Sequence, residues 1–235
     1  MSIKRKTIMS LVLGIGLTVT IFTNGYADTQ LVINDEPNII YEQSSYNATS
    51  SSSSSSSSKS KKWYYNTGTS LPKTPNYSKY NLSNYLNKGD IIYEKNGGFG
   101  ITGHIAIVEG RFYDTSKKIY YYRIIEAIDD GVVRSVLDDE RIVDKGVSIY
   151  RVKSATIEQK NRAVEFCKTQ LGKGYFLDFK KDKSANEKDW YCSELVWAAY
   201  INQGIDIETT RNINEPGITP RDICNSKSVS RVVFK

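Results

Sequence analysis

The sequence predicts an α+β domain in which antiparallel strands pack against helices. Two observations predict this fold class. Short segments rich in Ile, Val and Tyr follow one another between residues 90 and 153, separated in part by turn signals. Two amphipathic helical patterns come only afterwards, between residues 156 and 204. Because strands and helices do not alternate, the pattern does not fit a doubly wound parallel sheet.

The predicted strands form a meander. Asn96-Gly97-Gly98 separates the first two strands, and Asp129-Asp130-Gly131 follows the third. Turn signals of this kind join neighbouring antiparallel strands. The expected strands are Asp90–Glu94, His104–Tyr113, Lys118–Ile128, Gly146–Lys153 and Ser228–Phe234.

Two helices are expected next. The first begins at Thr156, because Gln159 stands at the spacing of a capping box, and it ends at Gly172. The second runs from about Tyr191 to Gln203, with Asp189 as its N-cap. Each helix has one apolar face, as expected of a helix that packs on a sheet.

Residues 1–27 have the order of a secretory signal peptide. Lys4, Arg5 and Lys6 form a cationic start, an apolar run of about 14 residues follows, and Ala27 offers a small residue at the cleavage point. The alternative is an uncleaved membrane anchor, but a span needs about 20 apolar residues. We therefore expect a secreted, extracytoplasmic protein.

Residues 28–62 are expected to be a flexible linker, because they contain the serine run 50–58. Residues 63–235 then have the length of one domain. The chain has a net charge of +6, and the signal peptide holds three positive charges and no acid, which leaves about +3. So small an excess gives little support for a nucleic-acid partner and is compatible with association with an anionic cell wall or a membrane surface.

His104 is the single histidine of the chain. It follows Gly103 at the start of an apolar strand, so any mechanism that pairs a Ser or Cys nucleophile with a His must use this residue as its base. The alternative is a structural histidine at a strand entrance.

Cys192 lies in the first turn of the second predicted helix, where free N–H groups and the helix dipole favour thiolate over thiol. Cys167 lies on an apolar helix face, and Cys224 lies in a short turn or helix. Three cysteines leave at least one without an intramolecular partner. If Cys167 and Cys224 pair or stay buried, Cys192 is the free thiol.

No cofactor is expected. One histidine and three scattered cysteines lack the spacing of a zinc site, so no metal is predicted. The glycine-rich stretch 97–100 joins two strands and opens no helix, which argues against a nucleotide site.

Glu126 is the candidate for the third group that a Cys-His pair needs to orient its imidazole. It lies on the strand expected to follow the histidine strand in the meander. The alternative is an outward-facing Glu on a half-exposed strand. Asp129, Asp130 and Glu109 are weaker candidates for the same role.

Four motifs follow one another along the chain: Gly89-Asp90-Ile91-Ile92, Gly103-His104-Ile105-Ala106-Ile107-Val108, Ile125-Glu126-Ala127 and Tyr191-Cys192-Ser193-Glu194-Leu195-Val196. In this order they resemble the circularly permuted branch of the NlpC-like papain fold, the YiiX-like amidases and peptidases. These enzymes are distant relatives of lecithin retinol acyltransferase. In ordinary NlpC-like cell-wall peptidases the Cys helix precedes the His strand, whereas here the order is reversed. The resemblance spans about residues 86–222 and implies a permuted papain-like fold, with an antiparallel sheet or barrel packed against helices.

The resemblance also implies roles for individual residues. Cys192 is the expected nucleophile, His104 the general base and then acid, and Glu126 the group that orients His104. Tyr175 and Tyr191 are expected to contact the substrate or the oxyanion.

Tyr175 lies in a stretch similar to the family pattern Gly-x-x-Tyr-Asp-x-x-Phe. In this chain Phe176 replaces the pattern's Asp, and Asp178 follows two residues later.

The activity implied is cleavage of amide bonds by thiolate acyl transfer, without a metal or organic cofactor. Together with the secretion signal, it points to peptidoglycan peptides as substrate. Three alternatives stay open: a lipid- or N-acyl-directed acyltransferase or esterase of the same fold, a non-catalytic wall-binding module, and a secreted toxin or effector.

Overall fold

The computed structural model describes residues 9–13, 17–21, 32–33, 39–40, 64–65, 71, 73–98, 103–115, 117–209 and 216–234. The chain divides into two compact units, residues 58–110 with 122–235 and residues 1–57 with 111–121. The expected signal peptide, linker and domain boundary fall largely outside the described residues, so they stay predictions. Within the described part of the chain, no helix combines the length and the apolar character that crossing a membrane requires.

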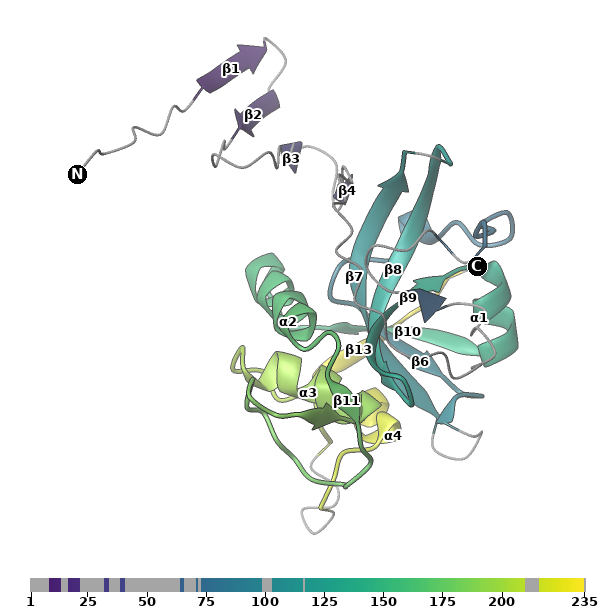
Figure 1. The fold of residues 1–235 in the computed structure, drawn as a ribbon, viewed down its shortest axis with the longest axis vertical. Helices are drawn as coiled ribbons and strands as arrows, with labels where there is room; N and C mark the ends of the chain where they lie inside the picture. The colour runs from purple at the N-terminus through teal and green to yellow at the C-terminus, as the bar shows by residue number, and fades with distance from the viewer. Residues whose placement is uncertain are drawn as a thin grey trace, which may run out of the picture. The chain divides into compact units, whose positions relative to one another are not determined.

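The larger unit is built on an antiparallel sheet (Figure 1). Its strands follow the spatial order β13-β10-β6-β7-β8-β9, and the short strand β5 (Tyr64–Tyr65) pairs with β9. The main strands are β6 (Ile91–Glu94), β7 (His104–Asp114), β8 (Ile119–Ile128), β9 (Gly131–Leu137), β10 (Val147–Val152) and β13 (Val229–Val232). All five predicted strands are therefore confirmed, with small shifts of their ends.

The sequence did not predict β9 or the helix α1 (Asp139–Lys145), both of which the structure contains. Strand β9 is buried at every position, so it lacks the alternation of a half-exposed strand. Helix α1 is short and mostly polar, and it begins because the Asp138 side chain accepts a hydrogen bond from the Arg141 N–H.

Both predicted helices are present. Helix α2 (Ile157–Thr169) starts with the expected capping box, in which the Thr156 and Gln159 side chains each accept the other residue's backbone N–H. It ends before Gly172, at Gln170. A short helix, α4 (Pro220–Asn225), carries Cys224.

Helix α3 (Cys192–Ile201) begins after Tyr191, which corrects the prediction that Asp189 is its N-cap. Asp189 and Trp190 instead form the strand β12, which pairs in parallel with β11 (Gly174–Tyr175). An extended segment paired to another strand cannot provide the first turn of a helix. Glu194 takes the capping role from inside α3, since its carboxylate accepts the Tyr191 N–H.

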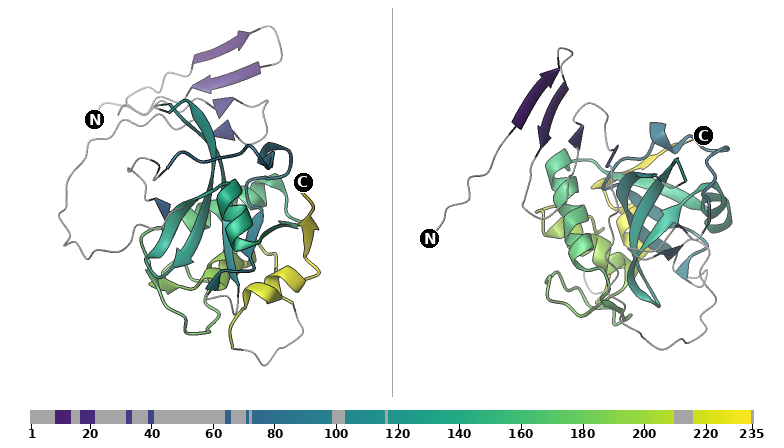
Figure 2. Two further views of the ribbon diagram at one scale, coloured as in Figure 1. Left: turned by 90° about the vertical axis from the view of Figure 1, so that its right-hand side faces the viewer. Right: turned by 45° about the horizontal axis from the view of Figure 1, so that its top comes forward.

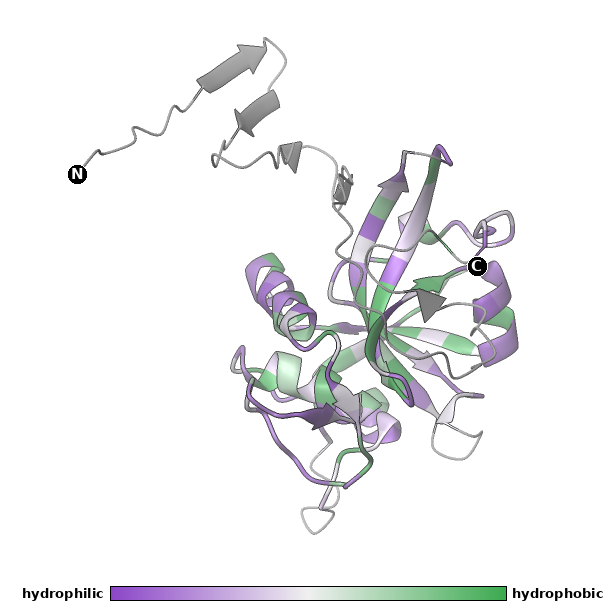
Figure 3. Cartoon of the chain, in the orientation of Figure 1, coloured by the Kyte–Doolittle hydropathy of each residue, from purple (hydrophilic) through white to green (hydrophobic). Residues whose placement is uncertain are grey.

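The sheet of the larger unit has an apolar core on each face, because successive strand residues point to opposite sides. Ile91 and Ile105 pack with α2 and α3, whereas their neighbours Ile92 and Ala106 belong to a second cluster with Ile142 of α1. Figure 2 shows α1 and α2 on opposite sides of the strands. Figure 3 shows apolar residues concentrated along the strands and polar residues over α1 and much of α2.

The smaller unit contains short strands. Strands β1 (Met9–Leu13), β2 (Leu17–Ile21) and β3 (Val32–Ile33) form an antiparallel sheet. Strand β4 (Ile39–Ile40) pairs in parallel with the end of β7 at Arg111 and Phe112.

Candidate active site

His104 begins β7, and its side chain is almost fully buried, with the residue 8% exposed. Its ring atom Nε2 lies 2.6 Å from Oε2 of Glu126 on β8. Glu126 therefore faces inward, which excludes the alternative of a solvent-exposed glutamate on a half-buried strand. The expected pairing of His104 with Glu126 is present.

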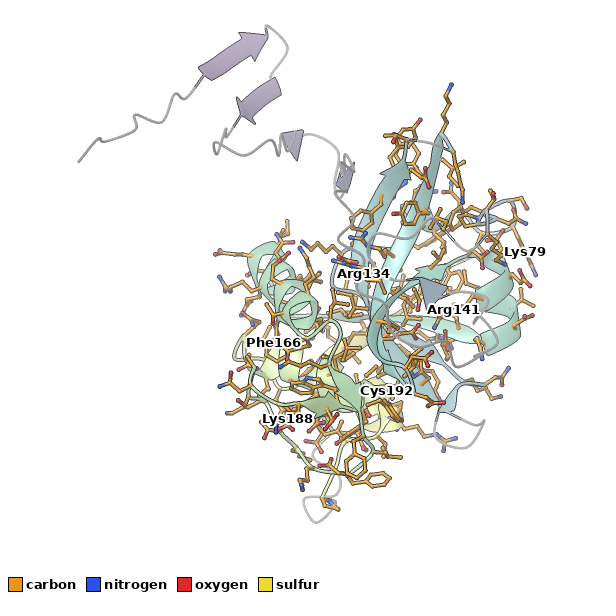
Figure 4. The ribbon with its side chains drawn as sticks, in the orientation of Figure 1. Lys79, Arg134, Arg141, Phe166, Lys188 and Cys192 are labelled. Carbon is orange, nitrogen blue, oxygen red and sulfur yellow. The ribbon has the colours of Figure 1, made fainter. Side chains whose placement is uncertain are left out.

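Cys192 is the first residue of α3 and is partly exposed (Figure 4). The His104 ring hydrogen-bonds to the Cys192 side chain. Because Nε2 of His104 faces Glu126, the nitrogen that remains for the sulfur is Nδ1. The Ile105 backbone N–H also hydrogen-bonds to the sulfur. The structure thus brings Cys192, His104 and Glu126 together in one line.

The proton shared by Cys192 and His104 lies with the imidazole. Burial alone lowers the pKa of His104, but hydrogen bonds to Cys192 and Glu126 and their charges outweigh it and raise the pKa to about 10. Burial also raises the pKa of Cys192, yet the hydrogen bond and charge of His104 bring the pKa below its ordinary value. Both directions favour a thiolate–imidazolium pair.

Glu126 is held by two side chains besides His104. The Ser135 hydroxyl on β9 donates to Oε1. The Arg141 guanidinium on α1 donates to both carboxylate oxygens, Nη1 to Oε1 at 3.1 Å and Nη2 to Oε2 at 2.7 Å. Burial raises the pKa of Glu126, but the charge of Arg141 and the bond to His104 hold it well below its usual value.

The two tyrosines predicted to contact substrate have different surroundings. Tyr175 on β11 is half-buried beside Cys192, and burial followed by the Cys192 charge raises its pKa. Tyr191 is buried, and its hydroxyl donates to the Lys180 carbonyl at 2.5 Å and accepts the Ile218 N–H at 3.1 Å. The Tyr191 hydroxyl is thus hydrogen-bonded to two backbone groups, and these bonds hold the segment that follows β11 in place.

That segment carries three exposed apolar side chains, Phe176, Leu177 and Phe179, which we call the apolar lip. They are 62%, 46% and 45% exposed. The Phe179 ring lies against that of Tyr191, with centroids 6.3 Å apart, and Tyr191 directly precedes Cys192. The apolar lip therefore contacts the residue that precedes α3.

The other two cysteines are free thiols in the structure. Cys167 is buried in the core between the sheet and α2, and burial raises the pKa of its thiol. Cys224 hydrogen-bonds to Tyr150, and burial raises its pKa to about 12. Of the three thiols, Cys192 alone has a lowered pKa.

Three residues of the site were missed by sequence reasoning: Ser135, Arg141 and Glu94. The last accepts from Nε of Arg141 at 2.5 Å. Ser135 lies on β9 and Arg141 on α1, neither of which was predicted, so no sequence signal placed them. Glu94 had a signal, since it ends the strand next to the histidine strand and lies opposite His104 in the register.

The protein is a cysteine-type hydrolase of the permuted papain-like class. Residues 83–230, more than half of the chain, match the family model described as "Permuted papain-like amidase enzyme, YaeF/YiiX, C92 family", and the chain belongs to this family. Both the resemblance and the fold class predicted from the sequence are thereby confirmed.

One solved structure is similar, the "metalloprotein yiiX from Escherichia coli O157:H7". It shares 19% sequence identity, with a TM-score of 0.43, over 63% of this chain and 97% of that one. No match was found among the curated proteins. Among the described residues of this chain, no group of three or more His, Cys, Asp and Glu side chains could hold a metal ion.

Proposed function

We propose that the protein is a cysteine amidase or peptidase that acts through an acyl-thioester on Cys192. The alignment of Cys192, His104 and Glu126 is the observation that carries this proposal. Membership of an amidase family supports the class of reaction. The polar groups around the sulfur support the mechanism, because they stabilise the negative charge that makes it a nucleophile.

The reaction has two halves. The Cys192 thiolate attacks the amide carbonyl carbon, a C–S bond forms, and the carbonyl electron pair moves to oxygen. We assign stabilisation of this oxyanion to the backbone N–H groups at the start of α3, with the Tyr175 hydroxyl as an additional donor. The C–N bond then breaks, and the His104 imidazolium gives its proton to the leaving amine.

Hydrolysis of the thioester completes the cycle. His104, now neutral, takes a proton from water, and the hydroxide formed attacks the thioester carbonyl. The C–S bond breaks, the acid is released, and the thiolate–imidazolium pair is restored. Glu126 accepts the Nε2–H throughout, which keeps Nδ1 facing the sulfur and stabilises the imidazolium.

The substrate we propose first is an amide bond of peptidoglycan peptides, in a protein secreted to the cell wall. The cationic and apolar start of the chain supports export. The family supports amide cleavage.

Alkylation of the thiols tests the mechanism without a substrate. Iodoacetamide labelling of the whole chain between pH 5 and 9, with the label located by mass spectrometry, compares three thiols in one molecule. Cys192 should react at pH 6, while Cys167 and Cys224 should not, and His104→Ala should shift the Cys192 midpoint to that of an ordinary thiol, near 8.5. If wild-type Cys192 shows the ordinary midpoint, the pair is not assembled and the mechanism is wrong.

The apolar lip favours a second candidate substrate, an N-acyl or lipid amide. Exposed aromatic and aliphatic side chains beside a nucleophile suit an acyl chain better than a polar stem peptide. Hydrolysis of muropeptides and of long-chain N-acyl amino acids should be compared for wild type and for Phe176→Ser/Leu177→Ser. Turnover of the N-acyl substrates that the substitutions abolish supports the second candidate, whereas turnover of muropeptides alone, unaffected by the substitutions, supports the first.

A further inference from the structure

We propose that Arg141 is a positioning residue, whose guanidinium fork holds the Glu126 carboxylate against His104 and supplies the charge that keeps it ionised. The inference rests on the proposed function, because it concerns the activation of Cys192. It adds one charged side chain to the three residues that the mechanism uses.

The geometry of Arg141 is that of a fixed clamp. Two of its nitrogens bond the two oxygens of Glu126, and Nε bonds Oε1 of Glu94. All three side chains are more than nine-tenths buried. A bidentate Arg–carboxylate contact fixes the plane of the carboxylate as well as its distance. The orientation of this plane matters because Oε2 of Glu126 also accepts a hydrogen bond from Nε2 of His104.

The backbone makes the clamp stiff. Arg141 sits in the first turn of α1, and its own N–H donates to the cap residue Asp138 at 3.0 Å. Glu94 ends β6 and lies directly opposite His104 in the β6–β7 register. The guanidinium is therefore held between Glu94 on β6, Glu126 on β8 and the start of α1, which restricts its movement.

The charges alternate along the cluster. Cys192 carries a negative charge, His104 a positive one, Glu126 a negative one, Arg141 a positive one and Glu94 a negative one. Without Arg141, the buried Glu126 carboxylate would lose the charge that holds its pKa down and would take up a proton more readily. A protonated Glu126 neither stabilises the imidazolium nor accepts its Nε2–H as strongly. The sulfur would then lose part of the charge that keeps it ionised.

The groups that face this cluster come from every neighbouring element. They are Glu94 on β6, His104 and the Ile105 N–H on β7, Ser135 on β9, Arg141 on α1, Tyr175 on β11, and Cys192 and Ser193 on α3. Arg141 has the only permanent charge in this set.

The same unit contains a matched control. Glu109 is buried with Arg123 and Arg134, and Arg123 bonds both Glu109 oxygens, at 2.5 and 2.8 Å. That cluster contains none of the groups named above. Arg123→Gln therefore breaks a buried Arg–Glu pair of comparable geometry outside the proposed site.

The test is the pH midpoint of Cys192 alkylation in wild type, Arg141→Gln and Arg123→Gln, with circular dichroism to verify folding. Arg141→Gln should raise the midpoint by about one pH unit, which is about a tenfold slower reaction at pH 6. Arg123→Gln should lose stability without moving the midpoint. Equal midpoints for all three folded proteins would overturn the proposal.

Two further variants keep the test decisive if Arg141→Gln does not fold. Arg141→Lys keeps the charge but loses the bidentate contact with Glu126. The midpoint of Cys192 alkylation should therefore move less than half as far as in Arg141→Gln, while kcat falls and KM stays unchanged. Glu94→Gln weakens the anchor of Arg141 and should raise the midpoint in the same direction. Wild-type behaviour in both would also overturn the proposal. An ordinary midpoint in wild type itself contradicts the proposed function instead, so the two failures are distinguishable.

Discussion

Under the proposed mechanism, two groups that share one proton, Cys192 and His104, set the pH range of activity. The lowered pKa of Cys192 opens the range, since the ion pair forms when the thiol loses its proton. The pKa of His104, about 10, closes it, since above that value the imidazole has no proton to give the leaving amine.

We expect kcat/KM for amide hydrolysis to follow a bell-shaped pH profile whose alkaline limb falls near pH 10. The limb reflects loss of the His104 proton, which the bonds to Cys192 and Glu126 otherwise retain. Steady-state rates between pH 5 and 11 measure it. A control reaction, the attack of Cys192 on iodoacetamide, needs no proton donor and should not fall at high pH. A decline of hydrolysis already at pH 7 would contradict this assignment.

Tyr191 and Tyr175 should respond differently to loss of the hydroxyl. Tyr191→Phe removes a bond to the Lys180 carbonyl and leaves the buried Ile218 N–H without its acceptor, so it should cost about 1–3 kcal/mol of stability. Tyr175→Phe should leave stability unchanged and lower kcat if its hydroxyl meets the oxyanion. Urea unfolding and kcat, measured for both variants, distinguish support from catalysis, and the reverse pattern would refute the assignment.

At the residue scale, the candidate site could be predicted because the residue types that it uses, histidine and cysteine, are rare in this chain. A chain with one histidine has one candidate base, and Cys192 stood out because of its place at a helix start. Arg141 and Ser135 could not be found this way. Arginine and serine are common and carry no signal of their own until the fold brings them to Glu126.

At the element scale, the connection between β9 and β11 positions Tyr175 beside Cys192. The Val132 N–H donates to the Lys173 carbonyl, and the Gly172 N–H donates to the Val132 carbonyl, both at 2.9 Å. Gly131 permits this approach. Its φ is +98°, and a Cβ there would lie 2.3 Å from the Lys173 oxygen.

Gly131→Ala and Gly172→Ala form a matched pair that tests this connection. Both glycines have positive φ, but a Cβ on Gly172 meets nothing within 4 Å. Gly172→Ala should therefore cost only the backbone strain, about 1–2 kcal/mol, while Gly131→Ala should cost on the order of 3 kcal/mol or more and displace Tyr175. Denaturant unfolding and the rate of Cys192 alkylation are the measurements. Equal costs would show that the close approach is not important.

Strand β9 and the true start of α3 escaped prediction for a similar physical reason, because each depends on a partner elsewhere in the chain. Strand β9 is buried throughout, yet it contains Arg134 and Ser135, so neither alternation nor an unbroken apolar run marks it. These two polar side chains can be buried because Arg134 bonds to the buried carboxylate of Glu109 and Ser135 to that of Glu126. Such partners come from other strands, and single-sequence periodicity does not register them. The displaced start of α3 has a similar cause, since Asp189 is drawn into a pairing with a distant glycine-containing segment.

At the scale of the whole molecule, buried ion pairs make stability depend on pH. Burial raises the pKa of Glu109 and Glu126, but their arginine partners outweigh it and lower both. A carboxylate with a lowered folded-state pKa contributes stability that is fully present above its unfolded pKa, about 4.3, and is lost as the pH falls through the folded value.

We therefore expect the free energy of unfolding contributed by these carboxylates to be intact at pH 6 and to fall steeply below about pH 4.3. Urea unfolding at pH 6, 5, 4 and 3 measures the decline. Glu158→Gln alters an exposed pair with Arg162 and serves as the control, because it should leave the slope unchanged. A stability that is flat down to pH 3 would be inconsistent with ionised Glu109 and Glu126 in the folded protein.

The two halves of the catalytic pair come from distant parts of the chain, His104 at the entrance of a strand and Cys192 at the start of a helix on one face of the sheet. A cysteine in an unfolded chain is an ordinary thiol, mostly protonated at neutral pH. Cys192 therefore gains its reactivity only when α3 docks on the sheet and meets the imidazole. Under the proposed mechanism, an unfolded molecule therefore carries no activated sulfur, and acylation of Cys192 waits until the strand and the helix have packed together.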